Sequence, residues 1–509
     1  MNSTLMILIV LLVIYIPIWI WTKTSPKAKN VGLETWGPAI KINTHLGLRI
    51  IERVARPRRF WHAMGLVSQA VAFLLMVMMI VIMANAVYRL PTSLQAGGVG
   101  IEYALALPGL NPLMPFWFTL LGFIIALVFH EMAHGIQSRA NDVDVTYTGL
   151  LYGVVPLGAF VEPDEKSMEK SSRRTKLDIY AAGITANFFI AAVAFILFSP
   201  VMLGTLHSDY EDNAAVYMNT ESEGIPAGSV ITLVDGIELE YADITEPKDS
   251  MSMWALGVPV TVTYDTEDSE GQTKIFRWGV YISTIVDDSA AEKAGLSEDD
   301  IVISITDTEG THYLYSNTAF TDYMSGTEGG QTVTVRYYDA SADAITDCDV
   351  VLGSKGGVGF LGIATTTAGM ALITTSEMIE TAANPFYGQE SLSDKMFGML
   401  RYISHPFSGF TPVPDEVHWW YDEPFDGFWA LTAIIYWTFW LNLLLGITNA
   451  LPAIPFDGGF IFRGWVDKLL ERMGKKDPEA REKQTDEITR NVSSVMLVLL
   501  VMVVVATLI

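Results

Sequence analysis

Six long apolar segments limit what this chain of 509 residues can fold into. They cover residues 4–21, 62–88, 116–137, 177–203, 426–450 and 491–509. Each approaches the length of about 20 residues that an α-helix needs to cross a hydrocarbon core of about 30 Å. Hydrophobic residues make up 50% of the chain and the mean hydropathy is +0.32, as in polytopic membrane proteins. We therefore predict a polytopic α-helical membrane protein with six spans, of which the first remains as an anchor.

The charges are distributed unevenly and indicate which loops face the cytoplasm. The loop 22–60 holds nine Lys and Arg against two Glu, and the stretches 166–176 and 463–490 are also rich in basic residues. By the positive-inside rule, all three loops are cytoplasmic. Between His207 and Asp394, six basic residues stand against 33 acidic ones, a balance of 6 − 33 = −27, while the whole chain carries −25. Six alternating spans place this acidic segment outside the cell, so we expect a multi-pass protein of the cell membrane and no nucleic-acid partner.

An H-E-x-x-H motif at the end of the third apolar segment points to metal chemistry. His130 and His134 are four residues apart, so they share one face of a helix and can bind one zinc ion. Glu131 between them is then placed to act as a general base on a water molecule. His130 lies 14 residues beyond Phe116, or about 21 Å along a helix, so we expect the site nearer the cytoplasmic face. The alternative is a pair of helix-end histidines that only make hydrogen bonds.

A catalytic zinc site needs a third protein ligand, and the chain offers Asp457. It lies in the sequence Asn-Ala-Leu-Pro-Ala-Ile-Pro-Phe-Asp-Gly-Gly of residues 449–459, directly after the fifth apolar segment. The two prolines prevent a regular helix, and such an interruption at membrane depth is tolerated where it is buried in protein or lines a wet cavity. The alternative is an aspartate that only caps the next helix.

The acidic segment contains a repeated β-rich pattern. Residues 224–236 are echoed by 289–305, since both pass from an Ala-Gly turn into a strand, and residues 258–264 are echoed by 331–337. The units resemble PDZ domains, which bind extended peptides at a sheet edge, so peptide tails are expected partners. The alternative is steric bulk over the membrane. The chain has a single cysteine, Cys348, which excludes an intrachain disulfide and a cysteine-based metal site.

Taken together, these motifs resemble the site-2 protease family of intramembrane zinc metalloproteases. The resemblance rests on His130-Glu131-x-x-His134, on the 449–458 block, and on PDZ-like modules between them. It implies that residues at the positions of His130, His134 and Asp457 hold Zn²⁺, and that Glu131 is the catalytic base. It also implies that transmembrane proteins are the substrates, within a lipid bilayer.

Two further features match the family less closely. Gly183-Ile184-Thr185-Ala186-Asn187 keeps the Gly and Asn of a family motif but lacks its proline. Asn187 could therefore stabilise an oxyanion or hold a substrate carbonyl, or it could make a hydrogen bond between helices. Residues 147–161 resemble the family's membrane-embedded β-hairpin, whose edge could pair with an extended substrate; the alternative is an interfacial loop.

Other function classes remain open from the sequence. A catalytically inactive PDZ-bearing membrane scaffold would not need all four site residues, and a transporter would show repeated transmembrane halves, which we do not find. We interpret the aromatic residues 418–421 as an interfacial belt before the fifth span. The expected organisation is 1–115 (two spans and a basic loop), 116–204 (membrane core), 205–278 and 279–355 (first and second PDZ-like modules), 356–425 (connector), 426–490 (core helix with Asp457, and a cytoplasmic loop) and 491–509 (last span).

Overall fold

The computed structural model describes residues 3–95, 114–153, 156–219, 225–238, 240–245, 256–404 and 413–506. Its chain forms two compact units. The helical unit comprises Met1–Met202, Leu400–Phe410 and Gly427–Ile509, and the β-rich unit comprises Leu203–Met399 and Thr411–Asp426. The β-rich unit is thus inserted between elements of the helical unit, as expected from the sequence.

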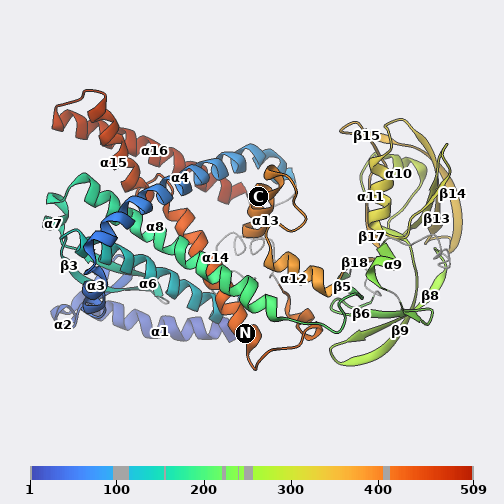
Figure 1. Ribbon diagram of the computed structural model, residues 1–509, viewed down its shortest axis with the longest axis horizontal. Helices are drawn as coiled ribbons and strands as arrows, with labels where there is room; N and C mark the ends of the chain where they lie inside the picture. Colours follow the sequence, from blue (N-terminus) through green and yellow to red (C-terminus); the bar gives the residue numbers. More distant parts are fainter. Residues whose placement is uncertain are drawn as a thin grey trace. The chain divides into compact units, whose positions relative to one another are not determined.

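The helical unit is built around three helices that pack against one another, α6, α8 and α14 (Figure 1). Helix α4 packs on α8, and the last helix, α16, packs on α15 and α4. The helices of this unit are α1 (Ser3–Thr24), α2 (Pro26–Asn30), α3 (Leu48–Ala55), α4 (Arg58–Gln95), α6 (Phe116–Ala140), α7 (Glu165–Lys170), α8 (Arg173–Ile196), η1 (Leu197–Met202), α14 (Phe428–Asn449), α15 (Asp457–Arg472) and α16 (Pro478–Ala506), while α13 (Leu392–Ser404) contains the boundary between the units.

Four helices of the described residues are long and apolar enough to cross a membrane, and they coincide with four of the six predicted spans. They are Arg58–Tyr88, Phe116–Ala140, Arg173–Thr205 and Phe428–Asn449. The first predicted span lies within α1, whose described apolar part is the shorter stretch Val10–Thr24. The last lies in the second half of α16, and its final residues, 507–509, are outside the described residues. The structure therefore shows a membrane protein, while the count of six spans stays a prediction.

The close packing of the central helices depends on small residues. A Cβ atom added to Gly122 of α6 would lie 2.9 Å from the backbone carbonyl carbon of Trp437 in α14. Backbone atoms cannot move aside by a change of rotamer as a side chain can. Only glycine at position 122 therefore permits this close approach of α6 and α14.

A four-stranded antiparallel sheet borders α6. Its order is β1 (Leu33–Trp36), β2 (Ala39–Thr44), β3 (Val145–Tyr152) and β4 (Pro156–Pro163). The pair β3–β4 is the hairpin expected at 147–161, and its place within the membrane or at its interface stays a prediction. The sequence did not predict β1 and β2, which come from the basic loop 22–60 and pair with β3 through Ile40↔Tyr152 to Thr44↔Thr148. Because β2 covers the far edge of β3, strand β4 is an edge of this sheet.

The β-rich unit contains one large sheet with a repeated strand order. One half reads β9 (Ser269–Arg277), β8 (Pro259–Thr266), β6 (Val230–Val234), β5 (Ala214–Asn219), β18 (Met370–Ile373), and the other reads β14 (Ala344–Val351), β13 (Thr332–Asp339), β11 (Ile301–Thr306), β10 (Val280–Ile285), β17 (Ile363–Thr367). The short strands also correspond, because β7 (Ile237–Glu238) pairs with β6, and β12 (Thr311–Tyr313) pairs with β11. Each half encloses its own hydrophobic core. The two halves are therefore equivalent modules, as the repeated sequence pattern predicted.

The modules are nested rather than consecutive. The first module takes its last strand, β18, from residues beyond the second module, and β18 pairs with β5 through Leu372↔Val216. The second module takes β17, which pairs with β10 through Val280↔Thr367. The predicted boundary at residue 355 therefore leaves both strands in the connector, although the structure places them in the sheet. The remaining elements of this unit are η2 (Leu203–Thr205), α9 (Tyr241–Thr245), α10 (Ala290–Ala294), α11 (Asn317–Ser325), β15 (Gly353–Lys355), β16 (Val358–Phe360), α12 (Thr375–Ala383) and η5 (Asp415–Trp420).

Two of the aromatic residues 418–421, for which we expected an interfacial belt, are buried in the protein: Trp420 and Tyr421. The indole N–H groups of Trp419 and Trp420 both donate to the carbonyl oxygen of Gly228, at 3.0 and 2.9 Å. Trp420 is only 1% exposed. Both indole N–H groups thus pair with a protein carbonyl, and the position of these residues relative to a membrane interface stays a prediction.

Candidate metal centre

Helix α6 brings the two histidines of the H-E-x-x-H motif onto one face. The Nε2 atoms of His130 and His134 lie 3.2 Å apart, and both side chains are largely buried. The Nδ1 atom of His134 donates to the carbonyl oxygen of Ile179 in α8 at 2.7 Å. A hydrogen bond at Nδ1 fixes the tautomer and leaves Nε2 with a free lone pair, which is the usual arrangement of a metal-binding histidine.

Asp457 completes a triangle with these two nitrogens. Its Oδ2 atom lies 3.2 Å from Nε2 of His130 and 3.2 Å from Nε2 of His134. Ligand atoms in a tetrahedral zinc site, each about 2.0–2.1 Å from the ion, are separated by about 3.4 Å. The three equal edges thus fit a tetrahedral metal ion that keeps its fourth position open. The convergence of all three side chains favours a metal site over helix-end histidines and a purely capping aspartate, and the metal site stays a prediction.

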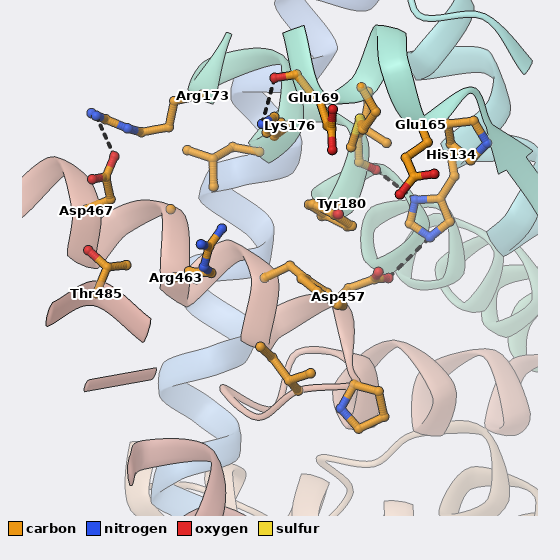
Figure 2. Close-up of a pocket in the computed structure, with 18 of the residues that line it drawn as sticks. His134, Glu165, Glu169, Arg173, Lys176, Tyr180, Asp457, Arg463, Asp467 and Thr485 are labelled. Atoms are coloured by element: carbon orange, nitrogen blue, oxygen red, sulfur yellow. Dashed lines mark hydrogen bonds and ion pairs between the residues drawn. The ribbon is translucent and has the colours of Figure 1, made fainter. Parts of the chain in front are cut away.

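The helical backbone is interrupted just before Asp457, as the two prolines of this segment predicted. Helix α14 ends at Asn449, and α15 begins at Asp457 itself. A Cβ atom on Gly458 would lie 2.4 Å from the carbonyl oxygen of Ala450, and one on Gly459 would lie 2.5 Å from the carbonyl carbon of Ala453. The two glycines therefore let the start of α15 fold tightly back on the loop, which points the carboxylate of Asp457 at α6. Figure 2 shows the carboxylate of Asp457 facing the imidazole of His134.

Gly183 brings helix α8 against the two histidines. A Cβ atom at this position would lie 2.5 Å from Nε2 of His134 and 2.7 Å from Cε1 of His130. Helix α8 can therefore approach the two histidines this closely only because residue 183 has no side chain. This accounts for the glycine of the Gly-x-x-x-Asn sequence, whose role was not clear from the sequence.

Asn187 lies one turn further along α8 and is fully buried. Neither its Nδ2 nor its Oδ1 atom has a hydrogen-bond partner among the described residues. The interhelical hydrogen bond weighed from the sequence is thus not formed in this structure. A buried amide without a partner is costly, which favours a role toward a bound molecule, and this role stays a prediction.

Glu131 is held by the neighbouring sheet. Its Oε2 atom accepts a hydrogen bond of 3.0 Å from the backbone N–H of Val161 in β4. This contact could not be predicted from the sequence, since the residues lie 30 positions apart.

The site opens into a pocket of about 990 Å³ that leads away from the metal ligands. Ion pairs join α8, α15 and α16 at its other end: Arg173 with Asp467 at 2.5 Å, Arg481 with Asp467 at 2.7 Å, and Arg463 with Asp486 at 2.7 Å. Figure 2 shows this charged end on the side opposite to His134. Sequence analysis assigned these residues only to a cytoplasmic loop. The pocket thus connects the apolar surroundings of α6 with a polar surface through which water can reach the ligands.

Comparison with known proteins identifies the family. Peptidase family M50 matches residues 118–500 of this chain. The chain belongs to peptidase family M50. A protein of Methanocaldococcus jannaschii, described as uncharacterized, is 25% identical over 279 residues, which is 52% of this chain and 73% of the relative.

Membership of peptidase family M50 confirms the resemblance to the site-2 proteases inferred from the sequence motifs. It identifies the chain as a member of a family of membrane metalloproteases that use zinc. The donor set fits such an ion, because two neutral imidazoles and one carboxylate are ligands that zinc prefers in catalytic sites. The family match begins at residue 118, so α1 to α4 and the strands β1 and β2 lie outside it.

Proposed function

We propose that this protein is an intramembrane zinc metalloprotease that hydrolyses peptide bonds within or near the transmembrane segments of other membrane proteins. The observation that carries the proposal is the triangle of His130, His134 and Asp457 beside Glu131. Both histidines lie on α6, which is long enough to cross a membrane, and Asp457 follows shortly after α14, which is as well. A zinc ion held there would polarise a peptide carbonyl and lower the pKa of a water molecule.

The chain's own groups would perform the proton transfers. Glu131 accepts a proton from the attacking water and then donates it to the amine nitrogen that leaves, so the carboxylate is regenerated. The buried amide of Asn187 would donate to the substrate carbonyl oxygen as negative charge develops there.

The substrate must reach this site in an extended form. A transmembrane helix keeps its carbonyl groups in intrahelical hydrogen bonds, so it has to unwind locally before a peptide bond can be attacked. The edge strand β4 lies beside Glu131 and could pair with the unwound segment as an additional strand.

Two substitutions test the reaction. Glu131→Gln should abolish cleavage of a transmembrane substrate while zinc stays bound, because the base is lost and the ligands remain. His134→Ala should lose both cleavage and most of the zinc. Cleavage by the Glu131→Gln protein at the wild-type rate would refute the proposed mechanism, whereas a zinc-loaded wild-type protein that cleaves no transmembrane substrate would favour the inactive membrane scaffold.

We also propose that the two β-rich modules are PDZ-like, stand outside the cell and restrict which substrates reach the site. Their net negative charge and their insertion between the core helices support this arrangement. An impermeant thiol reagent should label a cysteine placed at the exposed Thr308 in intact cells, and it should not label one at Ser171. The reverse labelling pattern would overturn the orientation.

The gating role predicts a broader substrate range when the modules are removed. Strand β18 belongs to the first module and ends at Ile373, so a Gly/Ser linker should replace residues 206–374. A deletion that stopped at residue 354 would leave this strand behind. The shortened protein should bind zinc and cleave substrates with bulky exterior domains. If it binds zinc but cleaves the same substrates at the same rates, the modules do not filter substrates by size.

A further inference from the structure

The hydrogen bond between Val161 and Glu131 joins an edge strand to the catalytic base. Val161 pairs with Thr148 of β3 in the ladder, yet its N–H points to the opposite side and donates to Oε2 of Glu131 at 3.0 Å. Backbone groups alternate in direction along a strand, so the N–H and C=O of Ala159 point to the same free side as those of Val161. The N–H groups of Phe160 and Glu162 point toward β3.

The side chain of Val161 contributes to the same arrangement. Its Cγ1 atom would lie 3.0 Å from a Cβ atom on Gly135, so β4 runs close to α6 one turn beyond Glu131. It also packs against the cluster formed by Ile51, Ala55, Ile136 and Ala140. Strand β4 is therefore fixed to α6 at this point, and the geometry of Glu131 depends on where the strand lies.

We propose that the backbone N–H of Val161 is a positioning group for the proteolytic reaction: it holds the Glu131 carboxylate beside the metal ligands. This inference rests on the proposed protease function. It also sets the substrate register, because the N–H of Val161 is already used. A substrate strand on the free edge of β4 pairs with the N–H and C=O of Ala159, two residues before Val161. The neighbouring substrate residues then lie beside the carboxylate of Glu131.

Proline substitution removes one backbone N–H group. It can therefore test separately whether β4 positions Glu131 and whether β4 pairs with the substrate. Val161→Pro should lower kcat by about 10- to 100-fold with little change in KM, because a misplaced catalytic group costs rates of this size. Ala159→Pro should mainly raise KM, since it removes a group that pairs with the substrate. Val161→Ala keeps the N–H and should keep most of kcat. Each protein is first checked for its zinc content and its melting temperature.

If Val161→Pro and Val161→Ala lower kcat by the same factor, the side chain and not the N–H is responsible, and the proposal is wrong. If the wild-type protein binds zinc but cleaves no transmembrane substrate, the proposed function fails instead. These two failures are therefore distinguishable.

Hydrogen exchange tests the contact without any cleavage and without a proline. In Glu131→Ala the amide of Val161 should exchange about tenfold faster or more than in the wild type, because a hydrogen bond to a charged group is lost. In Glu131→Gln the amide oxygen still accepts, so most of the protection should remain. The amides of Phe160 and Glu162 should be unchanged in both proteins. Equal exchange of Val161 in the wild type and in Glu131→Ala would overturn the proposal.

Discussion

Replacing Gly183 by alanine should disturb the metal site without removing any ligand. The new Cβ atom would lie 2.5 Å from Nε2 of His134, whereas an ordinary contact begins at 3.4 Å. The imidazole or helix α8 must therefore move by about 3.4 − 2.5 = 0.9 Å. The atom that is pushed away is the nitrogen that would bind zinc.

The size of the effect follows from this displacement. Distances between zinc and its ligands are held to within about 0.2 Å, so a shift of about 0.9 Å is more than four times what the site tolerates. Overpacking a tightly packed site costs about 1–3 kcal/mol. If this cost falls on the zinc-bound state, zinc affinity drops by about 5- to 150-fold.

The assay is a competition titration between the purified protein and a fluorescent zinc chelator. Gly446→Ala is the matched control, since it lies in the same helix bundle and its Cβ atom would make only an ordinary contact, 3.4 Å from Cβ of Asn187. Its zinc affinity should stay within about threefold of the wild type. If Gly183→Ala binds zinc as tightly as the wild type, the close approach of α8 to the histidines is not as described.

Three further changes test other parts of the structure. Ser493→Ala removes the hydroxyl that accepts a 3.1 Å hydrogen bond from the N–H of Ile454, in the loop before Asp457, and should weaken zinc binding by about tenfold while the fold is retained. Burial raises the pKa of the Cys348 thiol to about 11, so its alkylation at neutral pH should be slow and should accelerate about tenfold per pH unit up to that value, as followed by mass spectrometry. Gly122→Ala should destabilise the helical unit by about 1–3 kcal/mol, seen as a lower melting temperature, because the methyl group meets the backbone of Trp437.

The convergence of the two histidines could be predicted because their spacing is local, whereas Asp457 was proposed from its own motif and from the family resemblance. Two histidines four residues apart face the same side of any helix, and a proline-rich break directly after an apolar segment leaves few places for Asp457. The four apolar helices identified in the structure were likewise predictable from composition and length alone.

The contacts that were missed all join segments far apart in the chain. Strand β2 pairs with β3 across about a hundred residues, and β18 returns to β5 after the whole second module. Periodicity indicates that a segment is a strand but does not indicate its partner. The burial of Trp420 could not be predicted for a related reason: Trp suits a membrane interface and a protein interior equally well, and its hydrogen bond to the carbonyl oxygen of Gly228 joins segments far apart in the chain.

Hydrolysis inside a membrane requires water at a depth where water is scarce, and the shape of the pocket answers this requirement. The loop before Asp457 contributes Asn449, Ile454 and Pro455 to the pocket wall, so the irregular backbone faces the cavity. The far end of the pocket is lined by the ion-paired side chains of Arg173, Arg463 and Arg481, which make that end polar. The break in the helix therefore serves two needs at once: it turns a carboxylate toward the histidines, and it lines a pocket that joins Glu131 to these charged side chains.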